Sequence, residues 1–395
     1  MIGHGLSSIG TRMQEAAILW HLYELTESPW SLGALGLVRL GPILFLAIFG
    51  GVAADTLDRR RVLIFAQLAQ SLAAVFLTIF SFYGQMDTWH LYLAAALAAG
   101  TQAFDTPARK SLVPRLVGEN ALSEALAQAD VVKNIAKLLG PVLMGFITVS
   151  FGIKWVYFSN LISYGAVILA LLQLDPTRTK PALHALGIGE KTPNALTRIT
   201  EGIRWLWNEP LVMGLVWMDF MATFTASALT MLPIFAVDIL KLDAAGYGWL
   251  SMAGAGGALF AGGILSFFPF PSKPGKLALY AVVAYGGATI LFGLSTTLST
   301  ALISLSLVGA MDTISNVMRN ATMQLVCPDH LRGRMTAGSM IFTKSGPRLG
   351  EAEAGAVAAL YSAPTSVVSG GVLCILSAFW IAYRYPKLYQ WNRTL

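Results

Sequence analysis

The chain has 395 residues, of which 55% are hydrophobic and only 12% are charged, whereas an ordinary soluble domain carries about 25% charged residues. This composition excludes a soluble globular protein, a disordered chain and, with only two cysteines, a disulfide scaffold. The net charge of +6 comes from bases scattered between apolar runs, so it does not predict a nucleic-acid partner.

Apolar stretches broken by charged or turn residues predict twelve membrane-spanning helices. About 20 apolar residues in a helix cross a bilayer core of about 30 Å, and the chain is long enough for about twelve such spans. We place the spans at residues 1–25, 31–54, 61–84, 89–107, 129–150, 153–174, 211–236, 245–268, 275–295, 298–322, 335–359 and 364–384. The predicted fold class is an all-α integral membrane protein.

The least apolar stretch between spans, residues 175–207, is predicted to be a cytoplasmic linker between two six-helix halves, residues 1–174 and 208–395. The halves also share short glycine patterns at similar spacing. Gly50-Gly51 matches Gly262-Gly263, and Gly140-Pro141 matches Gly346-Pro347. Together these features indicate a duplicated bundle, a plan in which the substrate binds between the halves near the bilayer midplane.

The lysines and arginines predict which side of the membrane each loop faces. Short cytoplasmic loops carry an excess of these residues. With both termini in the cytoplasm, most bases fall in cytoplasmic loops, whereas the opposite loops hold only Lys154 and Lys241. We therefore expect a multi-pass protein with both termini cytoplasmic.

The loop between the second and third spans has the sharpest local pattern. It contains Gly51, then Asp55 and Asp58, and ends in the basic cluster Arg59, Arg60 and Arg61. A glycine permits close helix approach, and an acid can pair with bases or helix ends and so latch one conformation. The alternative is that the three arginines only anchor a cytoplasmic loop.

Charged residues within the spans are the main candidates for transport chemistry, because each costs about 2.5–3.5 kcal/mol at a helix centre. Helical spacing gives polar stripes to three spans. The first carries Ser8, Thr11, Arg12 and Glu15; the seventh carries Asp219 and Thr223; the tenth carries Asp312, Ser315, Asn316, Arg319 and Asn320. The alternative is internal pairing, which is easy for Arg12 and Glu15 at a spacing of three but hard for Asp312 and Arg319 at seven.

The eleventh span is unusually charged, with Lys344, Arg348, Glu351 and Glu353 close together. The first three share a helix face, which favours a self-neutralising structural ladder. The functional alternative makes Glu351 or Glu353 a proton carrier, because a carboxylate in a low-dielectric environment binds a proton more readily.

Cofactor chemistry is not indicated. The five histidines, His4, His21, His90, His184 and His330, are far apart and show no metal-ligand spacing with the cysteines. No glycine-rich phosphate loop is present, which argues against an ATP-driven pump. We therefore expect no metal, no cofactor and no enzymatic activity.

The loop motif from Gly51 to Arg61 resembles that of the major facilitator superfamily, whose fold has twelve helices in two six-helix pseudo-repeats. Further blocks are similar to the branch that includes enterobactin exporters and macrolide efflux pumps. These are Gly10 to Gln14, Tyr23 to Pro29, Asp105 to Arg109, Leu112 to Pro114, Pro328 to Arg334 and Leu349 to Gly355. In this superfamily, spans 1, 4, 7 and 10 line the central cavity.

The fifth span resembles an antiporter motif through Gly140, Pro141 and Gly145, although Met144 replaces the first of its paired glycines. The resemblance implies a transporter in the bacterial inner membrane that exports a small amphiphile, with a siderophore as the first expectation and protons as the coupling ion. Arg12 and Arg319 are suited to an anionic substrate. The chain is expected to act as a monomer.

Other functions remain open at this point. A macrolide or multidrug efflux pump is the main alternative, followed by a metabolite importer. A non-transporting membrane protein with the same fold is a further alternative, but the sequence shows neither an appended soluble domain nor a clustered nucleophile and base.

Overall fold

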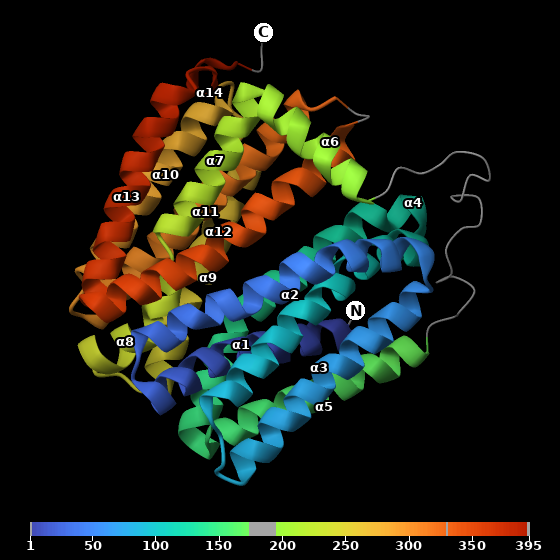
Figure 1. Ribbon diagram of the computed structural model, residues 1–395, viewed down its shortest axis with the longest axis vertical. Helices are drawn as coiled ribbons and strands as arrows, with labels where there is room; N and C mark the ends of the chain where they lie inside the picture. Colours follow the sequence, from blue (N-terminus) through green and yellow to red (C-terminus); the bar gives the residue numbers. More distant parts are fainter. Residues whose placement is uncertain (1, 174–194, 329–330, 393–395) are drawn as a thin grey trace. The chain divides into compact units, whose positions relative to one another are not determined.

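The computed structural model describes residues 2–173, 195–328 and 331–392, and every regular element in these ranges is helical (Figure 1). The elements are α1 (Ile2–Thr26), α2 (Pro29–Thr56), α3 (Arg59–Phe82), α4 (Thr88–Phe151), α5 (Ile153–Leu172), α6 (Ala195–Asn208), α7 (Pro210–Thr225), η3 (Ala228–Met231), α8 (Leu232–Ile234), η4 (Phe235–Ile239), α9 (Ala244–Phe267), α10 (Pro274–Gly293), α11 (Leu298–Val326), α12 (Arg332–Leu360), α13 (Ala363–Arg384) and α14 (Lys387–Gln390). Helices account for the described residues of all twelve predicted spans, with an interruption in the seventh, and this confirms the predicted fold class.

The ends of these helices follow from local sequence chemistry. Asp58 caps α3, because its carboxylate accepts a hydrogen bond from the backbone nitrogen of Arg60. Asp87 and His90 form a reciprocal capping box at the start of α4. Gly152, with a φ of 93°, separates α4 from α5 in a conformation that other residues adopt only under strain.

Eight helices in the described ranges are long and apolar enough to cross a membrane by themselves. They lie in α2, α3, the second part of α4, α5, α9, α10, α11 and α13. Helices α1 and α12 are outside this set, and both carry charged residues that the sequence singles out as candidates. Helix α7 is apolar but short, with 16 residues. The predicted spans that are not long and apolar enough by themselves therefore include those that carry candidate functional groups.

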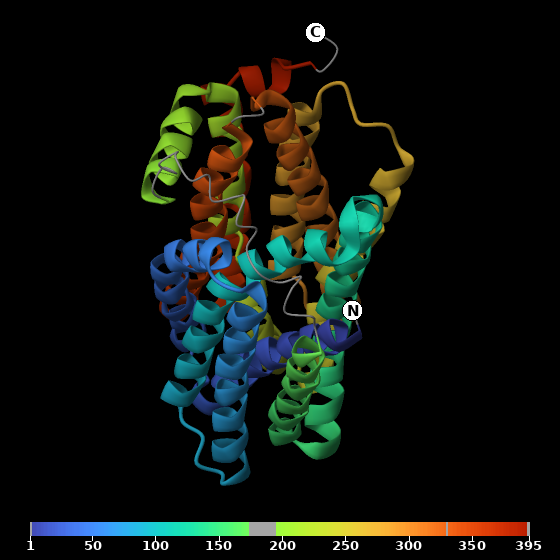
Figure 2. The same cartoon turned by 90° about the vertical axis from the view of Figure 1, so that its right-hand side faces the viewer.

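Helix α4 differs from the sequence expectation, because the predicted spans at 89–107 and 129–150 are joined in one helix of 64 residues. The segment between them consists largely of helix-forming residues, and Gln128 donates a hydrogen bond to Glu124 one turn earlier. Pro107 and Pro114 lie within the helix, and its path changes direction between the two apolar parts (Figure 2). The two predicted spans are thus connected without a loop.

The predicted seventh span, residues 211–236, is also not one regular helix. Helix α7 ends at Thr225 and is followed by the short elements η3, α8 and η4. The carbonyl oxygen of Ala226 accepts a hydrogen bond from the hydroxyl of Tyr285 on α10, at 2.9 Å. This side chain replaces a backbone partner that the interruption removes, as a polar group within a membrane requires.

Packing divides the described chain into two compact units. The first contains described residues of Met1–Thr26, Val38–Ala195 and Asp243–Gly248, and the second contains those of Glu27–Leu37, Leu196–Leu242 and Trp249–Leu395. The predicted division into residues 1–174, a linker at 175–207, and 208–395 stays a prediction. Residues 175–194 of that linker, which include His184, lie outside the described residues, as does His330. Helix α6 occupies the end of the linker.

Close glycine contacts explain why two short segments belong to a different unit from the residues next to them in the chain. Glu27–Leu37, which includes the start of α2, belongs to the second unit, and Asp243–Gly248, at the start of α9, belongs to the first. In the second unit, a Cβ atom added to Gly33 of α2 would lie 2.7 Å from the Cα atom of Gly355 on α12. In the first unit, a Cβ atom added to Gly145 of α4 would lie 2.4 Å from the carbonyl oxygen of Ala244 on α9. Such close backbone approach is how helices associate in lipid, where apolar side chains gain nothing from leaving water.

Candidate functional site

The second unit holds a buried ion pair that joins two helices. Asp219 lies on α7 and Arg319 on α11, and Asp219 Oδ1 is 2.5 Å from Arg319 Nη2. Their side chains are only 14% and 4% exposed. A buried charge without a partner is strongly destabilising, and this contact neutralises both charges. The pair therefore holds α7 against α11 while both groups are charged.

Two hydroxyl groups complete the hydrogen bonds of this pair. Arg319 Nη1 donates to Ser315 Oγ, which lies one turn earlier on α11, at 2.7 Å. Thr343 Oγ1 of α12 donates to Asp219 Oδ2 at 2.8 Å. Helices α7, α11 and α12 thus meet at the side chains of Asp219, Ser315, Arg319 and Thr343, which we call the Asp219–Arg319 site.

The structure pairs two candidates that the sequence treats separately. The sequence places Arg319 on one stripe with Asp312, whereas its carboxylate partner is Asp219, 100 residues away on another helix. No periodicity relates residues at that separation. Sequence reasoning also misses Thr343, whose only signal is its position beside Lys344 in the charged part of α12.

Glycines on α12 allow Thr343 to reach Asp219. A Cβ atom added to Gly346 would lie 2.6 Å from Thr223 Oγ1, and one added to Gly350 would lie 2.4 Å from the carbonyl oxygen of Phe224. Both contacts are with α7, so α12 approaches that helix at backbone distance. Larger residues at these positions would separate the helices and lengthen the hydrogen bond to Asp219.

The other candidates of the second unit have different surroundings. Arg348 Nη1 lies 2.5 Å from Glu351 Oε1, which is one step of the predicted ladder on α12. Glu353 is half-buried on the same helix. Asn316 accepts a hydrogen bond from Asn320 along α11. Asp312 interacts electrostatically with Tyr285 of α10, as Asp219 and Arg319 also do.

In the first unit, Arg12 and Glu15 form an ion pair within α1. Arg12 Nη1 is 2.6 Å from Glu15 Oε2, as the spacing of three residues allows. Both side chains are 33% exposed, so this pair is far more accessible than the Asp219–Arg319 site. Solvent screens a partly exposed pair, and either group can therefore change partners at small cost.

Gly140 positions Arg12 by permitting close approach of α4 to α1. A Cβ atom added to Gly140 would lie 2.5 Å from the Cβ atom of Arg12 and 3.1 Å from its carbonyl carbon. The following residue, Pro141, lies within α4 and removes a backbone hydrogen bond there. The predicted motif of the fifth span therefore packs directly against Arg12.

The substitution Gly140→Ala is expected to displace Arg12 and to lower transport by at least about tenfold, because small misplacements of functional groups have large effects. The matched control is Gly165→Ala on α5 of the same unit, where an added Cβ atom would meet nothing within 4 Å. Transport rates in proteoliposomes check this, with the amount of inserted protein measured in parallel. Equal rates for the two variants would contradict the positioning role.

The two Gly-Pro pairs occupy corresponding positions in the two units. Gly140-Pro141 packs on α1 at Arg12, and Gly346-Pro347 packs on α7 at Thr223, one turn from Asp219. Ser227 also donates a hydrogen bond to the carbonyl oxygen of Pro347. Each pair thus lies against the first helix of its predicted half, beside that helix's charged residue, as expected for a duplicated bundle.

Two bases of the predicted loop motif bind neighbouring helices. Arg60 donates to the carbonyl oxygens of Leu171 and Leu172 at 2.7 and 2.6 Å, where the negative end of the α5 dipole favours a cation. Arg59 Nε donates to Ser111 Oγ of α4 at 2.8 Å. The structure does not describe the side chain of Asp55 or the surroundings of Gly51, so the latch by Asp55 stays a prediction, as does any role for Arg61.

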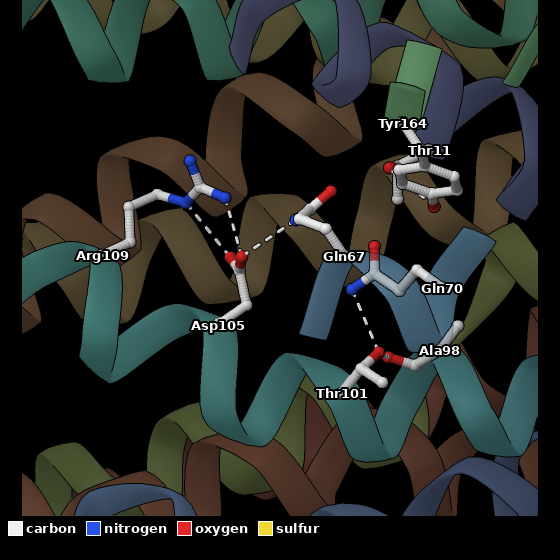
Figure 3. A network of polar contacts seen from close by, with 8 residues as sticks. All are labelled: Thr11, Gln67, Gln70, Ala98, Thr101, Asp105, Arg109 and Tyr164. Atoms are coloured by element: carbon white, nitrogen blue, oxygen red, sulfur yellow. Dashed lines mark hydrogen bonds and ion pairs between the residues drawn. The ribbon is translucent and has the colours of Figure 1, made fainter. Parts of the chain in front are cut away.

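Another polar cluster ties α3 to α4 within the first unit (Figure 3). Arg109 donates two hydrogen bonds to Asp105, at 2.7 and 3.1 Å, and Gln67 of α3 donates a third at 3.1 Å. Gln70 donates to Thr101 Oγ1 one turn away at 3.0 Å. Asp105 and Arg109 belong to a sequence block that carries the family resemblance, and their contacts here stabilise the pairing of two helices.

Within residues 2–173, 195–328 and 331–392, no group of three or more histidine, cysteine or acidic side chains could hold a metal ion. In the Asp219–Arg319 site the buried polar groups bind one another. What the arrangement offers chemically is a carboxylate and a guanidinium that can separate when either acquires another partner.

Comparison with known proteins gives one family and several relatives. The family described as transmembrane secretion effector, of the major facilitator type, matches residues 2–393. The enterobactin exporter EntS of Salmonella choleraesuis (strain SC-B67) is 24% identical over 373 residues, which cover 94% of this chain and 88% of the relative. EntS of Shigella boydii serotype 18 is 23% identical over 367 residues, covering 93% and 86%.

Solved transporter structures share the fold at low identity. A bacterial homolog of the human lysosomal transporter Spinster superposes with a TM-score of 0.74 at 15% identity, covering 99% of this chain and 97% of its own. The peptide transporter POT gives 0.75 at 11% identity, with 99% and 94% covered. The nucleoside transporter NupG gives 0.70 at 12% identity, with 98% and 100% covered.

Proposed function

Because the chain belongs to the transmembrane secretion effector family of the major facilitator superfamily, we propose that it exports a siderophore by proton-coupled alternating access. The family and the structural relatives are transporters rather than enzymes, and the chain is a multi-pass membrane protein with a small-molecule substrate. The siderophore, the coupling proton, a monomeric state and cytoplasmic termini in the bacterial inner membrane are parts of the proposal.

One observation carries the proposed mechanism: the ion pair of Asp219 and Arg319 is buried between two membrane-spanning helices. The substrate binds while Asp219 is ionised: one of its oxygens accepts a hydrogen bond from Arg319, and one of its hydroxyl groups donates to the Asp219 carboxylate. A proton on Asp219 removes this acceptor, so protonation expels the substrate, and release of the proton restores the site. Proton and substrate thereby compete for one site, as antiport requires.

The free energy stored in a pH gradient can drive such an exchange. A difference of one pH unit across the membrane supplies about 1.4 kcal/mol for each proton moved. A ligand shifts a two-state equilibrium only through its different affinity for the two states, so the proton must bind more tightly in one of them. Asp219 meets this condition if its contact with Arg319 is made in one state and broken in the other.

The substrate class is supported by two features. The relatives named above are enterobactin exporters, although they are only 23–24% identical to this chain. Arg12 and Arg319 also offer cationic groups to catecholate or carboxylate oxygens, through charge-assisted hydrogen bonds. A macrolide or other multidrug substrate is the principal alternative, and a metabolite importer is the next.

Transport assays in proteoliposomes test this proposal. We expect enterobactin to accumulate in inside-out vesicles when their lumen is acidic, and we expect Asp219→Asn to abolish the dependence on the pH gradient. Erythromycin, a macrolide with a basic amine and no anionic group, serves as the comparison substrate. Absence of enterobactin flux from correctly folded protein would refute siderophore export, and gradient-driven erythromycin flux in its place would favour multidrug efflux.

A further inference from the structure

The two oxygens of the Asp219 carboxylate have different partners. Oδ1 is bound by Arg319 Nη2 at 2.5 Å, on the deeply buried side of the site. Oδ2 accepts a hydrogen bond from Thr343 Oγ1 at 2.8 Å, and Thr343 lies on the exposed surface of α12. Of these two partners of the carboxylate, the threonine is the exposed one and the arginine the buried one.

A proton that arrives at Asp219 is best accommodated on Oδ2. A proton on Oδ1 would face the N–H groups of Arg319, and two donors would then oppose each other. On Oδ2 it meets the hydroxyl of Thr343, which can either donate or accept a hydrogen bond. The threonine hydroxyl can turn, so that the protonated carboxyl group donates to Thr343 Oγ1.

We propose that Thr343 is a positioning residue for a proton on Asp219. Its hydroxyl donates to Oδ2 when the carboxylate is ionised and paired with Arg319, and it accepts from Oδ2 when the carboxyl group is protonated. The inference rests on the proposed function, in which Asp219 carries the coupling proton. It adds a residue from α12 to a site that the sequence assigns to the seventh and tenth spans.

Other titratable groups surround the site and contribute to its electrostatics. They come from the helices that pack around α7: Arg319 and Asp312 on α11, Tyr285 on α10, Cys374 on α13, and Lys344 beside Thr343 on α12. Arg319 and Thr343 hydrogen-bond directly to the Asp219 carboxylate. The threonine can therefore be altered without changing any of these charges.

The substitution Thr343→Val is expected to raise the pH at which Asp219 is half-protonated by about one pH unit. Valine has nearly the same shape but no hydroxyl, so the ionised carboxylate loses a strong hydrogen bond and the protonated carboxyl group loses a weaker one. The difference between the two losses corresponds to about one pH unit. Thr343→Ser keeps the hydroxyl and is expected to retain the wild-type midpoint. Thr336→Val is the matched control on α12, because Thr336 is exposed and donates only to the carbonyl oxygen of Arg332.

Infrared difference spectroscopy of the full-length protein in lipid measures this without a substrate. The carbonyl band of protonated Asp219 is identified by its absence in Asp219→Asn and is followed as the pH is changed. We expect its midpoint to move upward in Thr343→Val and to be unchanged in Thr343→Ser and Thr336→Val. An unmoved midpoint in Thr343→Val, or an equal shift in Thr336→Val, would overturn the role of Thr343.

The pH profile of enterobactin flux separates failure of this inference from failure of the proposed function. The profile of Thr343→Val is expected to move in the same direction as the infrared midpoint, and Thr343→Ser is expected to restore it. If wild-type flux is independent of pH and no band is lost in Asp219→Asn, proton coupling at Asp219 is refuted. If both are present but Thr343→Val changes neither midpoint nor profile, only the role of Thr343 is refuted.

Discussion

Replacing Arg319 with methionine is expected to reduce export of an anionic substrate by about 10-fold to 100-fold, while export of a substrate without an anionic group falls much less. A hydrogen bond to a charged group contributes about 1.5–3 kcal/mol, and each 1.4 kcal/mol corresponds to a factor of ten. Methionine retains much of the apolar stem of arginine, so the loss is chiefly one of charge. Parallel flux measurements with enterobactin and erythromycin check the result.

The same substitution leaves Asp219 buried without its guanidinium partner, and a loss of thermal stability is expected in addition. The double variant Asp219→Asn with Arg319→Met removes both charges and serves as the control. It is expected to recover most of the stability but not the transport of the anion. Recovery of anion transport in the double variant would show that Arg319 is structural. Equal losses for the anionic substrate and for the substrate without an anionic group, in the single variant, would show the same.

The second large effect is expected at a helix crossing in the second unit, where Gly257→Ala should strongly destabilise the protein. An added Cβ atom at Gly257 of α9 would lie 1.8 Å from the carbonyl oxygen of Ser306 on α11. The crossing is reciprocal, because a Cβ atom at Gly309 of α11 would lie 1.9 Å from the carbonyl oxygen of Gly254. Neither backbone can move without separating the two helices.

The adjacent residue provides the matched control. An added Cβ atom at Gly256 would meet nothing within 4 Å, so Gly256→Ala changes the same helix by the same group without a clash. Overpacking costs about 1–3 kcal/mol, whereas alanine in an open helical position is favourable by about 0.5–1 kcal/mol. We therefore expect the two variants to shift the thermal unfolding midpoint in lipid in opposite directions, and equal midpoints would contradict the tight crossing.

The outline of the fold was predictable because it depends on local composition. Apolar runs of the right length predict spans, and the helices occupy each of them. The joined spans of α4 were not predictable, since Pro107 and Pro114 are ordinary signals of a helix break. In a bent membrane helix, neighbouring groups can form the hydrogen bonds that a proline removes from the backbone. A proline therefore does not by itself end such a helix.

The site was predictable in its residue types but not in its pairings. Arg12 and Glu15 lie three residues apart on one helix, so their ion pair follows from helical geometry alone. The same geometry cannot relate Asp219 to Arg319, which belong to different helices, and it gives Thr343 no distinction from other exposed threonines. Their contacts depend on how closely three helices pack.

By itself, the sequence determined that the chain is an all-helical membrane protein, where its spans lie and which few charged residues are candidates. Composition and periodicity are local properties, and the free energy of transfer into lipid acts on each segment separately. Only the tertiary structure decided which charge neutralises which, because pairing depends on distances across helix interfaces. Those distances are set by glycines such as Gly346, whose missing side chain brings α12 against α7 and Thr343 onto Asp219.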